Sequence, residues 1–265
     1  MIIIYPKKNV FSIIKTTQIV AGNDAAIEDF PFIAEVQGRA KRQDPWKHYC
    51  SAVIISETML VTSAACIRGP KVNRRVKCGL ENLSDKNIQI RTIKHSKIVS
   101  ITKHPHNNWN VKDEFGVQFD NNVAVIELHS PLNFGPKCQS ISYTTIKGCG
   151  GFKNCQISGW GFIDDNKTET ETLQFADISV ISNAECNDLV DPKVPKRQIC
   201  THDNKKQPCN GDAGGPLTCE INERRVLVGV FGWLYDCDAK NPTFYTHVAY
   251  YTFFIEKWTD IKGIP

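Results

Sequence analysis

Acyl transfer by a hydroxyl nucleophile requires a serine that attacks the carbonyl, a histidine that takes its proton, and a buried carboxylate that stabilises the imidazolium. The glycine-rich stretch at residues 209–216 is the kind of loop that could carry such a nucleophile. It holds Ala213 among its glycines, and no serine follows before Cys219. The stretch at residues 61–66 holds Ala65 directly before its cysteine and contains no histidine. The two segments therefore lack an attacking oxygen and a proton acceptor.

The surrounding sequence predicts mainly short strands. Apolar, β-branched runs with turn residues between them recur at residues 51–55, 59–62, 122–128 and 226–231. Many short strands at such spacing are typical of a barrel or sandwich. Helical periodicity is clear only near the end, where Tyr251, Phe254, Ile255 and Trp258 share one face. The fold that positions the two segments is therefore predicted to be all-β with one C-terminal helix.

Six short segments occur in an order that is highly specific as a set. They are IVAG at 19–22, VTSAAC at 61–66, DNNVAV at 120–125, ISGWG at 157–161, CNGDAGGP at 209–216 and PTFYT at 242–246. The set resembles the chymotrypsin- and trypsin-like serine proteases over nearly everything from Ile19 onward. The resemblance implies two antiparallel six-stranded β-barrels, a C-terminal α-helix, and an active site in the cleft between the barrels.

The same resemblance divides the chain. Residues 1–18 are expected to be a leader or pro-segment, and residues 19–265 a trypsin-like domain. Within that domain, barrel 1 is expected at about 19–135, barrel 2 at about 136–248, and the helix at about 249–261.

The resemblance assigns three positions to the catalytic triad, and all three are altered. Ala65 stands at the position of the base, Asn122 at that of the carboxylate, and Ala213 at that of the nucleophile. Losing the nucleophile or the base lowers the rate by about 10⁶-fold, since the three residues act as a unit. Binding and oxyanion donors alone leave roughly 10³–10⁴-fold over water. The sequence thus predicts a protein without proteolytic activity and with no catalytic residues.

The primary substrate pocket is predicted to be narrowed or filled. The resemblance places Gln207 at its base, where tryptic enzymes have Asp, and puts Leu234 and Thr243 at wall positions that are usually Gly. Gly232 replaces a serine whose hydroxyl supports the catalytic carboxylate in the family. Gly211 keeps the backbone position of the oxyanion hole.

Activation by cleavage is a further family property with partial matches here. Ile19 corresponds to the mature N-terminus, and Asp212 to the carboxylate that receives its ammonium group. Gln18 precedes Ile19, so a tryptic activator is not indicated. Whether Asp212 serves structure or regulation stays open at this point.

Eleven cysteines indicate an oxidised, secreted, extracellular protein, because cytosolic thiols are kept reduced. The resemblance implies the pairs Cys50–Cys66, Cys155–Cys219, Cys186–Cys200 and Cys209–Cys237. Cys138–Cys149 is a plausible fifth pair, which would leave Cys78 either buried and inert or free to link to a partner. Two sequons, at Asn82 and Asn166, are candidates for glycosylation.

Composition excludes several other functions. A net charge of +4 over 265 residues gives no general case for nucleic-acid binding, and no stretch is long enough to span a membrane. Histidines and cysteines are not grouped at ligand spacing, so no metal or cofactor is expected. Two local basic clusters, interpreted here as solvated loops, are Arg39, Lys41 and Arg42, and Arg74, Arg75 and Lys77.

The pattern of losses resembles the inactivated paralogues of the mite group 3 allergen proteases, especially those of the scabies mite. That resemblance implies a secreted monomer that binds host proteins and interferes with host defence, such as complement activation. Three alternatives stay open: an engineered, disabled form of an active digestive protease, a residual esterase-like activity using the Gly211 amide, and a decoy that traps substrates in an open cleft.

Overall fold

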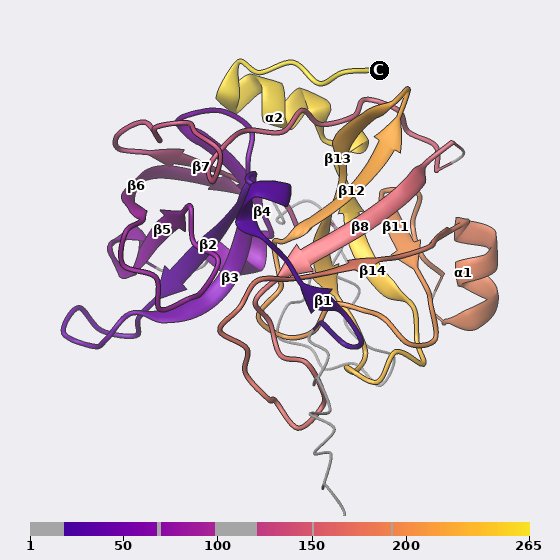
Figure 1. The fold of residues 1–265 in the computed structure, drawn as a ribbon. Coiled ribbons are helices and arrows are strands. Elements are labelled where there is room, and N and C mark those ends of the chain that lie inside the picture. The colour runs from indigo at the N-terminus through magenta and orange to yellow at the C-terminus, as the bar shows by residue number, and fades with distance from the viewer. Residues whose placement is uncertain (1–18, 68–69, 99–120, 150, 192) are drawn as a thin grey trace, which may run out of the picture.

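The computed structural model describes residues 19–67, 70–98, 121–149, 151–191 and 193–265. The expected leader at 1–18 and Asp120 of the third segment lie outside the described residues. Figure 1 shows two β-structures side by side, with the C-terminal helix lying across one end. The prediction of an all-β fold with a C-terminal helix is confirmed.

The first half is a closed barrel in the order β2-β3-β4-β7-β6-β5. Its strands are β2 (Ile33–Gly38), β3 (Lys47–Ile54), β4 (Met59–Thr62), β5 (Arg74–Cys78), β6 (Gln89–Ile98) and β7 (Ala124–Leu128). Every pair is antiparallel, so alternate residues face inward. Ala34, Val36, Ile54, Leu60 and Val76 are fully buried in its interior and form one apolar cluster.

The second half is a curled eight-stranded sheet in the order β1-β9-β8-β12-β13-β14-β11-β10. Its strands are β1 (Asn23–Asp24), β8 (Lys153–Gly159), β9 (Gln174–Asp177), β10 (Val180–Ile181), β11 (Gln198–Thr201), β12 (Pro216–Ile221), β13 (Arg224–Trp233) and β14 (Thr243–His247). It has two strands more than the predicted six because two-residue edge strands are added at both ends: β1, from the start of the domain, pairs with β9, and β10 pairs with β11.

Short helices close the fold. Helix α1 (Asn183–Leu189) begins with a capping box, in which Ser182 and Glu185 satisfy each other's backbone amides. Helix α2 (Thr252–Thr259) buries Ile255 against the core that both halves share. The 3₁₀ turns are η1 (Ile27–Asp29), η2 (Ala64–Ile67), η3 (Lys71–Asn73) and η5 (Val248–Tyr250). In the part of the chain that is described, neither α-helix has the length and hydrophobicity that crossing a bilayer would need.

The structure has five disulfide bonds. They are Cys50–Cys66, Cys78–Cys138, Cys155–Cys219, Cys186–Cys200 and Cys209–Cys237. Four match the pairs expected from the resemblance. The expected Cys138–Cys149 pair is wrong: barrel closure brings the end of β5 beside the connection at residues 135–138, and Cys78 therefore pairs with Cys138. Cys149 is the free thiol, and it is partly exposed.

Candidate functional site

The three positions predicted to correspond to the catalytic triad lie together at the boundary of the two halves. Ala65 lies in η2, and its amide donates a hydrogen bond to Asn122 Oδ1 at 3.2 Å. The carbonyl oxygen of Ala213 lies 3.3 Å from Cys66 Sγ, one residue beyond Ala65. The same oxygen accepts the Ser51 amide at 2.8 Å, so Ala213 is anchored to β3 of the first barrel. The fold therefore brings the predicted site residues together. Ala65 and Ala213 contribute methyl groups to this site, and Asn122 contributes an amide.

Asn122 is completely buried, and its side chain is satisfied without a charge. Oδ1 accepts the hydroxyl of Ser63 at 2.7 Å as well as the Ala65 amide, and Nδ2 donates to the carbonyl of Gly232 at 3.4 Å. The Asn122 carbonyl accepts the hydroxyl of Thr246 at 3.0 Å. An amide has one acceptor and one donor end, and both are matched here. A carboxylate at this position would face the Gly232 carbonyl with an acceptor instead of a donor.

The loop that carries Ala213 retains the backbone geometry for binding an anion. Gly211 and Gly214 have φ of +103° and +81°, which favour glycine. A Cβ on Gly214 would overlap Thr62 Oγ1 and the Ser51 carbonyl. The amides of Gly211 and Ala213 donate to no acceptor within the described residues. Two free amides on one loop are suited to a developing negative charge, but they supply neither nucleophile nor base.

Asp212 is buried, with 1% of its surface exposed. Its carboxylate accepts the amides of Gly161 at 2.7 Å and Cys209 at 2.9 Å. Burial raises the pKa of the carboxyl to about 6, against the opposing effect of those two amides and of nearby His48. A Cβ at Gly159 or Gly161 would overlap the carboxylate. The absence of side chains at Gly159 and Gly161 therefore leaves the space that the Asp212 carboxylate occupies.

In the uncut chain Ile19 is buried and has a φ of +46°. Its nitrogen belongs to a peptide bond rather than to an ammonium group, and Val20 forms a bridge with Gln207. An ion pair between Ile19 and Asp212 stays a prediction for the cleaved chain.

Two of the positions predicted for the primary pocket, Gln207 and Thr243, contact each other. Gln207 is buried, its Nε2 donates to the carbonyl of Asp236 at 2.6 Å, and its Oε1 lies 3.5 Å from the hydroxyl of Thr243. Leu234 packs against the apolar cluster of the second half. A Cβ added at Gly232 would lie 3.3 Å from the carbonyl oxygen of Phe244. The base of this pocket thus has its hydrogen-bonding capacity taken up by the chain itself.

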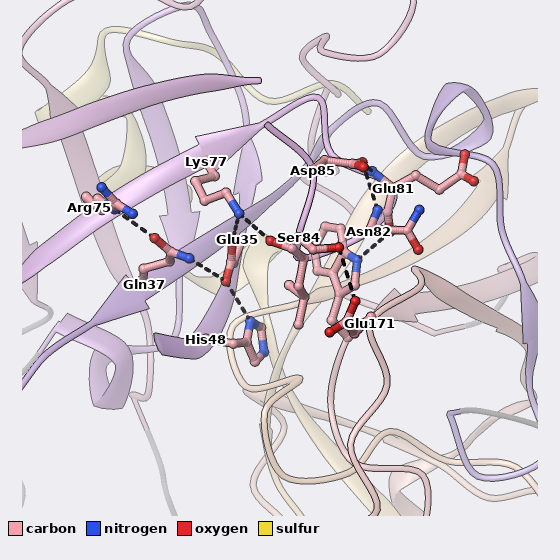
Figure 2. Close-up of polar contacts among 12 residues, drawn as sticks. Glu35, Gln37, His48, Arg75, Lys77, Glu81, Asn82, Ser84, Asp85 and Glu171 are labelled. Carbon is pink, nitrogen blue, oxygen red and sulfur yellow. Dashed lines mark hydrogen bonds and ion pairs between the residues drawn. The ribbon is translucent and has the colours of Figure 1, made fainter. Parts of the chain in front are cut away.

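A buried charged network in the first barrel was missed by the sequence analysis (Figure 2). Glu35 is fully buried, and its carboxylate contacts Lys77 Nζ at 3.0 Å and His48 Nδ1 at 3.4 Å. Gln37 Nε2 donates to Glu35 at 3.2 Å, and Arg75 Nε donates to Gln37 at 2.7 Å. Burial alone would raise the pKa of Glu35, but His48 and Lys77 hold it below its ordinary value.

This network reaches the candidate site through His48. Its Nε2 lies 3.0 Å from the carbonyl oxygen of Gly211, so one ring bridges the buried Glu35 and the anion-binding loop. The imidazole is therefore held by two partners, away from the triad positions. A charged residue inside the apolar run at 33–36 was the available signal for this network.

A cavity of about 500 Å³ lies between the two halves beside His48. Trp160, Gly211 and Glu171 also line it, whereas Gln207, Leu234 and Thr243 do not. Within the described residues, no group of three His, Cys, Asp or Glu side chains is placed to hold a metal ion.

The two sequons differ in their surroundings. Asn166 is exposed in the turn at 164–168, where Thr168 binds Asp164. Asn82 is partly buried, and its Oδ1 accepts the hydroxyl of Thr172 at 2.8 Å. Asn166 is thus the more accessible acceptor.

The fold, the disulfides and the order of the segments define a trypsin-family domain. The Trypsin family model matches residues 19–255, and the chain belongs to this family. It is 31% identical over 243 residues to transmembrane protease serine 9 of Rattus norvegicus; the match covers 88% of this chain but 21% of that protein. It is 29% identical to cationic trypsin-3 of Rattus norvegicus, covering 79% of each, and 26% identical to trypsin of Xenopus laevis, covering 90% of each.

Proposed function

We propose that this chain is a secreted, proteolytically inactive trypsin-family protein that acts by binding other proteins. One observation carries the proposal: the three positions that lie together at the boundary of the two halves hold Ala65, Asn122 and Ala213. No hydroxyl, imidazole or carboxylate is present on these side chains. Without them, peptide cleavage loses roughly 10⁶-fold in rate.

Neighbouring groups do not replace the missing ones. The hydroxyl of Ser63 donates to Asn122 at 2.7 Å, so it has no base to activate it. The imidazole of His48 lies between Glu35 and the Gly211 carbonyl. These contacts argue against a residual esterase-like activity that would borrow a nearby nucleophile. The self-bonded Gln207 argues against a decoy that holds substrate in the primary pocket.

Secretion is supported by the five disulfides, which form and persist in oxidising compartments. They also hold a rigid scaffold whose loops are free to serve as a binding surface. The resemblance to the inactivated mite paralogues supports host-defence proteins, including complement components, as the partners.

The direct test is an activity assay on the chain with residues 1–18 removed so that Ile19 is the N-terminus. We expect no cleavage of casein, no turnover of activated esters, and no labelling by a fluorophosphonate probe. Cationic trypsin run in parallel is the positive control. Turnover that the probe abolishes would contradict the proposal. A natural gene encoding His at position 65 and Ser at position 213 would instead favour an engineered, disabled protease.

Restoring the triad separates chemistry from substrate access. The triple variant Ala65→His, Asn122→Asp, Ala213→Ser is expected to react with the probe, because the three positions already lie together. It should still cleave tryptic substrates poorly, since Gln207 is bound by its neighbours and Leu234 stands at a pocket wall. Efficient cleavage after Lys or Arg by this variant would refute the assignment of a closed pocket.

A further inference from the structure

We propose that a basic groove on the first barrel is the binding face, and that its ligand is an acidic protein segment carrying an apolar side chain. The inference rests on the proposed function, because it assumes that the chain acts by binding proteins. The basic groove is a second cavity of about 500 Å³. It is lined by Gly38, Arg39, Ala40, Asp44, Pro45, Lys47, His48, Tyr49 and Arg74.

Strand pairing builds this groove from segments far apart in the sequence. Gly38 at the end of β2 pairs with Lys47 of β3 on one side and with Arg74 of β5 on the other. The β2–β3 connection, which projects from the first barrel (Figure 1), is fastened to the start of β5. Arg39 N donates to the Asn73 carbonyl at 3.1 Å, and Asn73 Nδ2 donates to the Ala40 carbonyl at 3.0 Å. The first basic cluster therefore lies beside Arg74 and Arg75 of the second, whereas Lys77 is buried against Glu35.

The charge of this surface is strongly one-sided. Its six cationic side chains are Arg39, Lys41, Arg42, Lys47, Arg74 and Arg75, and Asp44 is the carboxylate that lines the same groove. These residues account for five positive charges, so the rest of the chain carries about one negative charge in total. Asp44 itself accepts the Lys41 amide at 2.8 Å. Arg39, Lys41, Arg42 and Lys47 make no ion pair with any described residue.

Aromatic rings hold the guanidinium groups in place. Those of Arg39 and Arg75 lie 4.1 and 4.6 Å from the ring of Trp46, and that of Arg74 lies 4.2 Å from the ring of Tyr49. Arg74 and Arg75 also donate to the chain itself, from Arg74 Nε to the Cys66 carbonyl at 3.2 Å and from Arg75 Nε to Gln37 Oε1 at 2.7 Å. Their positive charge, together with that of Arg39, still attracts carboxylates, which are preferred partners of arginine. The positive groups are thus ordered before a ligand arrives, which lowers the entropy lost on binding.

The lining of the groove selects the class of ligand. The uncharged residues Gly38, Ala40, Pro45 and Tyr49, called the floor here, give part of its lining an apolar character. An acidic peptide with one apolar side chain matches both features, whereas a sulfated polysaccharide offers nothing apolar for the floor. Single-stranded nucleic acid needs open aromatic faces for its bases, but Arg39 and Arg75 already stack on Trp46.

Acidic residues next to the groove limit where an acidic ligand can bind. The neighbouring cavity shares Lys47, His48 and Tyr49 with the groove, but Glu169 and Glu171 line its other side. Their carboxylates repel an acidic segment, so such a ligand is confined to the first barrel.

Fluorescence anisotropy with a short labelled peptide, in which glutamates flank one phenylalanine, tests the inference. Arg39→Glu with Lys47→Glu should weaken binding by about tenfold or more. Lys47→Glu alone, at an exposed position that no packing depends on, should still weaken it measurably. The control is Lys153→Glu with Lys205→Glu, an equal charge change at exposed positions on the second half, which should leave binding nearly unchanged.

Two probes define the chemistry further. Replacing the peptide's phenylalanine with alanine should weaken binding through loss of contact with the floor, and raising salt from about 50 to about 500 mM should weaken it by screening. A heparin fragment that binds more tightly than the peptide would overturn the inference in favour of a polysaccharide, and absence of peptide binding would overturn it outright.

A pull-down of host serum proteins on the immobilised chain keeps the two proposals apart. A host protein captured equally well by wild type and by Arg39→Glu with Lys47→Glu would refute the basic groove while leaving the binding function intact. Proteolytic activity of the wild-type chain would refute the proposed function whatever the groove binds.

Discussion

Replacing His247 with phenylalanine tests how one buried imidazole affects stability in weakly acidic solution. His247 ends β14, and 1% of its surface is exposed. Its ring packs against Phe152 at 6.0 Å and Tyr250 at 5.3 Å between ring centres. Burial lowers its pKa to about 4, because the charged imidazolium is poorly solvated among these rings. Phenylalanine removes the titrating group and keeps an aromatic ring in the site.

The sign follows from the two pKa values. The unfolded chain protonates His247 near its ordinary value of 6.5, whereas the folded chain does so only near 4. Between these values the unfolded state binds more protons, so the stability present above pH 6.5 is lost as the pH falls towards 4. The difference between the two pKa values corresponds to about 3 kcal/mol at full loss.

Asp212 has the opposite effect over nearly the same range. Its folded pKa is raised to about 6 from an ordinary value of 3.8. Its stabilising contribution is therefore fully present below pH 3.8 and is lost as the pH rises through 6. In the wild type the two buried groups partly cancel. In His247→Phe only the Asp212 effect remains, so the variant should gain stability relative to the wild type as the pH falls.

Urea unfolding at pH 4.5, 5.5 and 6.5 measures this directly. The difference in unfolding free energy between His247→Phe and wild type should shift towards the variant by roughly 2–3 kcal/mol across the series. His202→Phe is the matched control, since that ring is not fully buried and contacts the Lys240 carbonyl at 3.2 Å. A difference that stays constant with pH for His247→Phe would refute the reasoning.

Three further predictions concern the first barrel, the free thiol and the sequons. Glu35→Ala should lower stability by about 3–5 kcal/mol because it strands the buried Lys77 ammonium, and Glu35→Leu with Lys77→Met should recover most of the loss in urea unfolding. Iodoacetamide should label Cys149 alone, and slowly at pH 8 because burial raises its pKa; labelling at any other cysteine in the mass spectrum would contradict the disulfide assignment. Expressed through a secretory pathway, the chain should carry a glycan at Asn166 and little at Asn82; a mass shift that survives Asn166→Gln would be inconsistent with their exposures.

The fold was predictable because its determinants are local and ordered along the chain. Six short segments in sequence order were sufficient for the two-part β architecture, and four cysteine pairs followed from the same resemblance. The apolar spacing of Tyr251, Phe254, Ile255 and Trp258 predicted helix α2; Tyr251 and Ile255 are buried, whereas Trp258 at its end is exposed. The three positions assigned to the triad from their flanking residues lie close together in the structure, while the assignment itself stays a prediction.

The features that were missed depend on strand pairing across the barrel. Cys78 joins Cys138 because barrel closure brings β5 beside the connection between the halves, and spacing along the chain does not reveal that contact. Glu35 and Lys77 lie 42 positions apart, and they become partners only because β2 pairs with β5. Pairing of β2 with β5 likewise brings Arg39 near Arg74 and Arg75, so an interpretation of each basic cluster as an isolated solvated loop missed their combined charge.

The proposed loss of catalytic side chains is compatible with an intact scaffold. Asp212 fills a cradle that Gly159 and Gly161 leave open, so its removal would disturb packing. Ala65 and Ala213 have no comparable role, because their backbones make the anchoring contacts and their side chains are only methyl groups. The buried amide at position 122 has already satisfied both of its ends. The proposed binding function would therefore depend on surfaces such as the basic groove, where positive charge is concentrated.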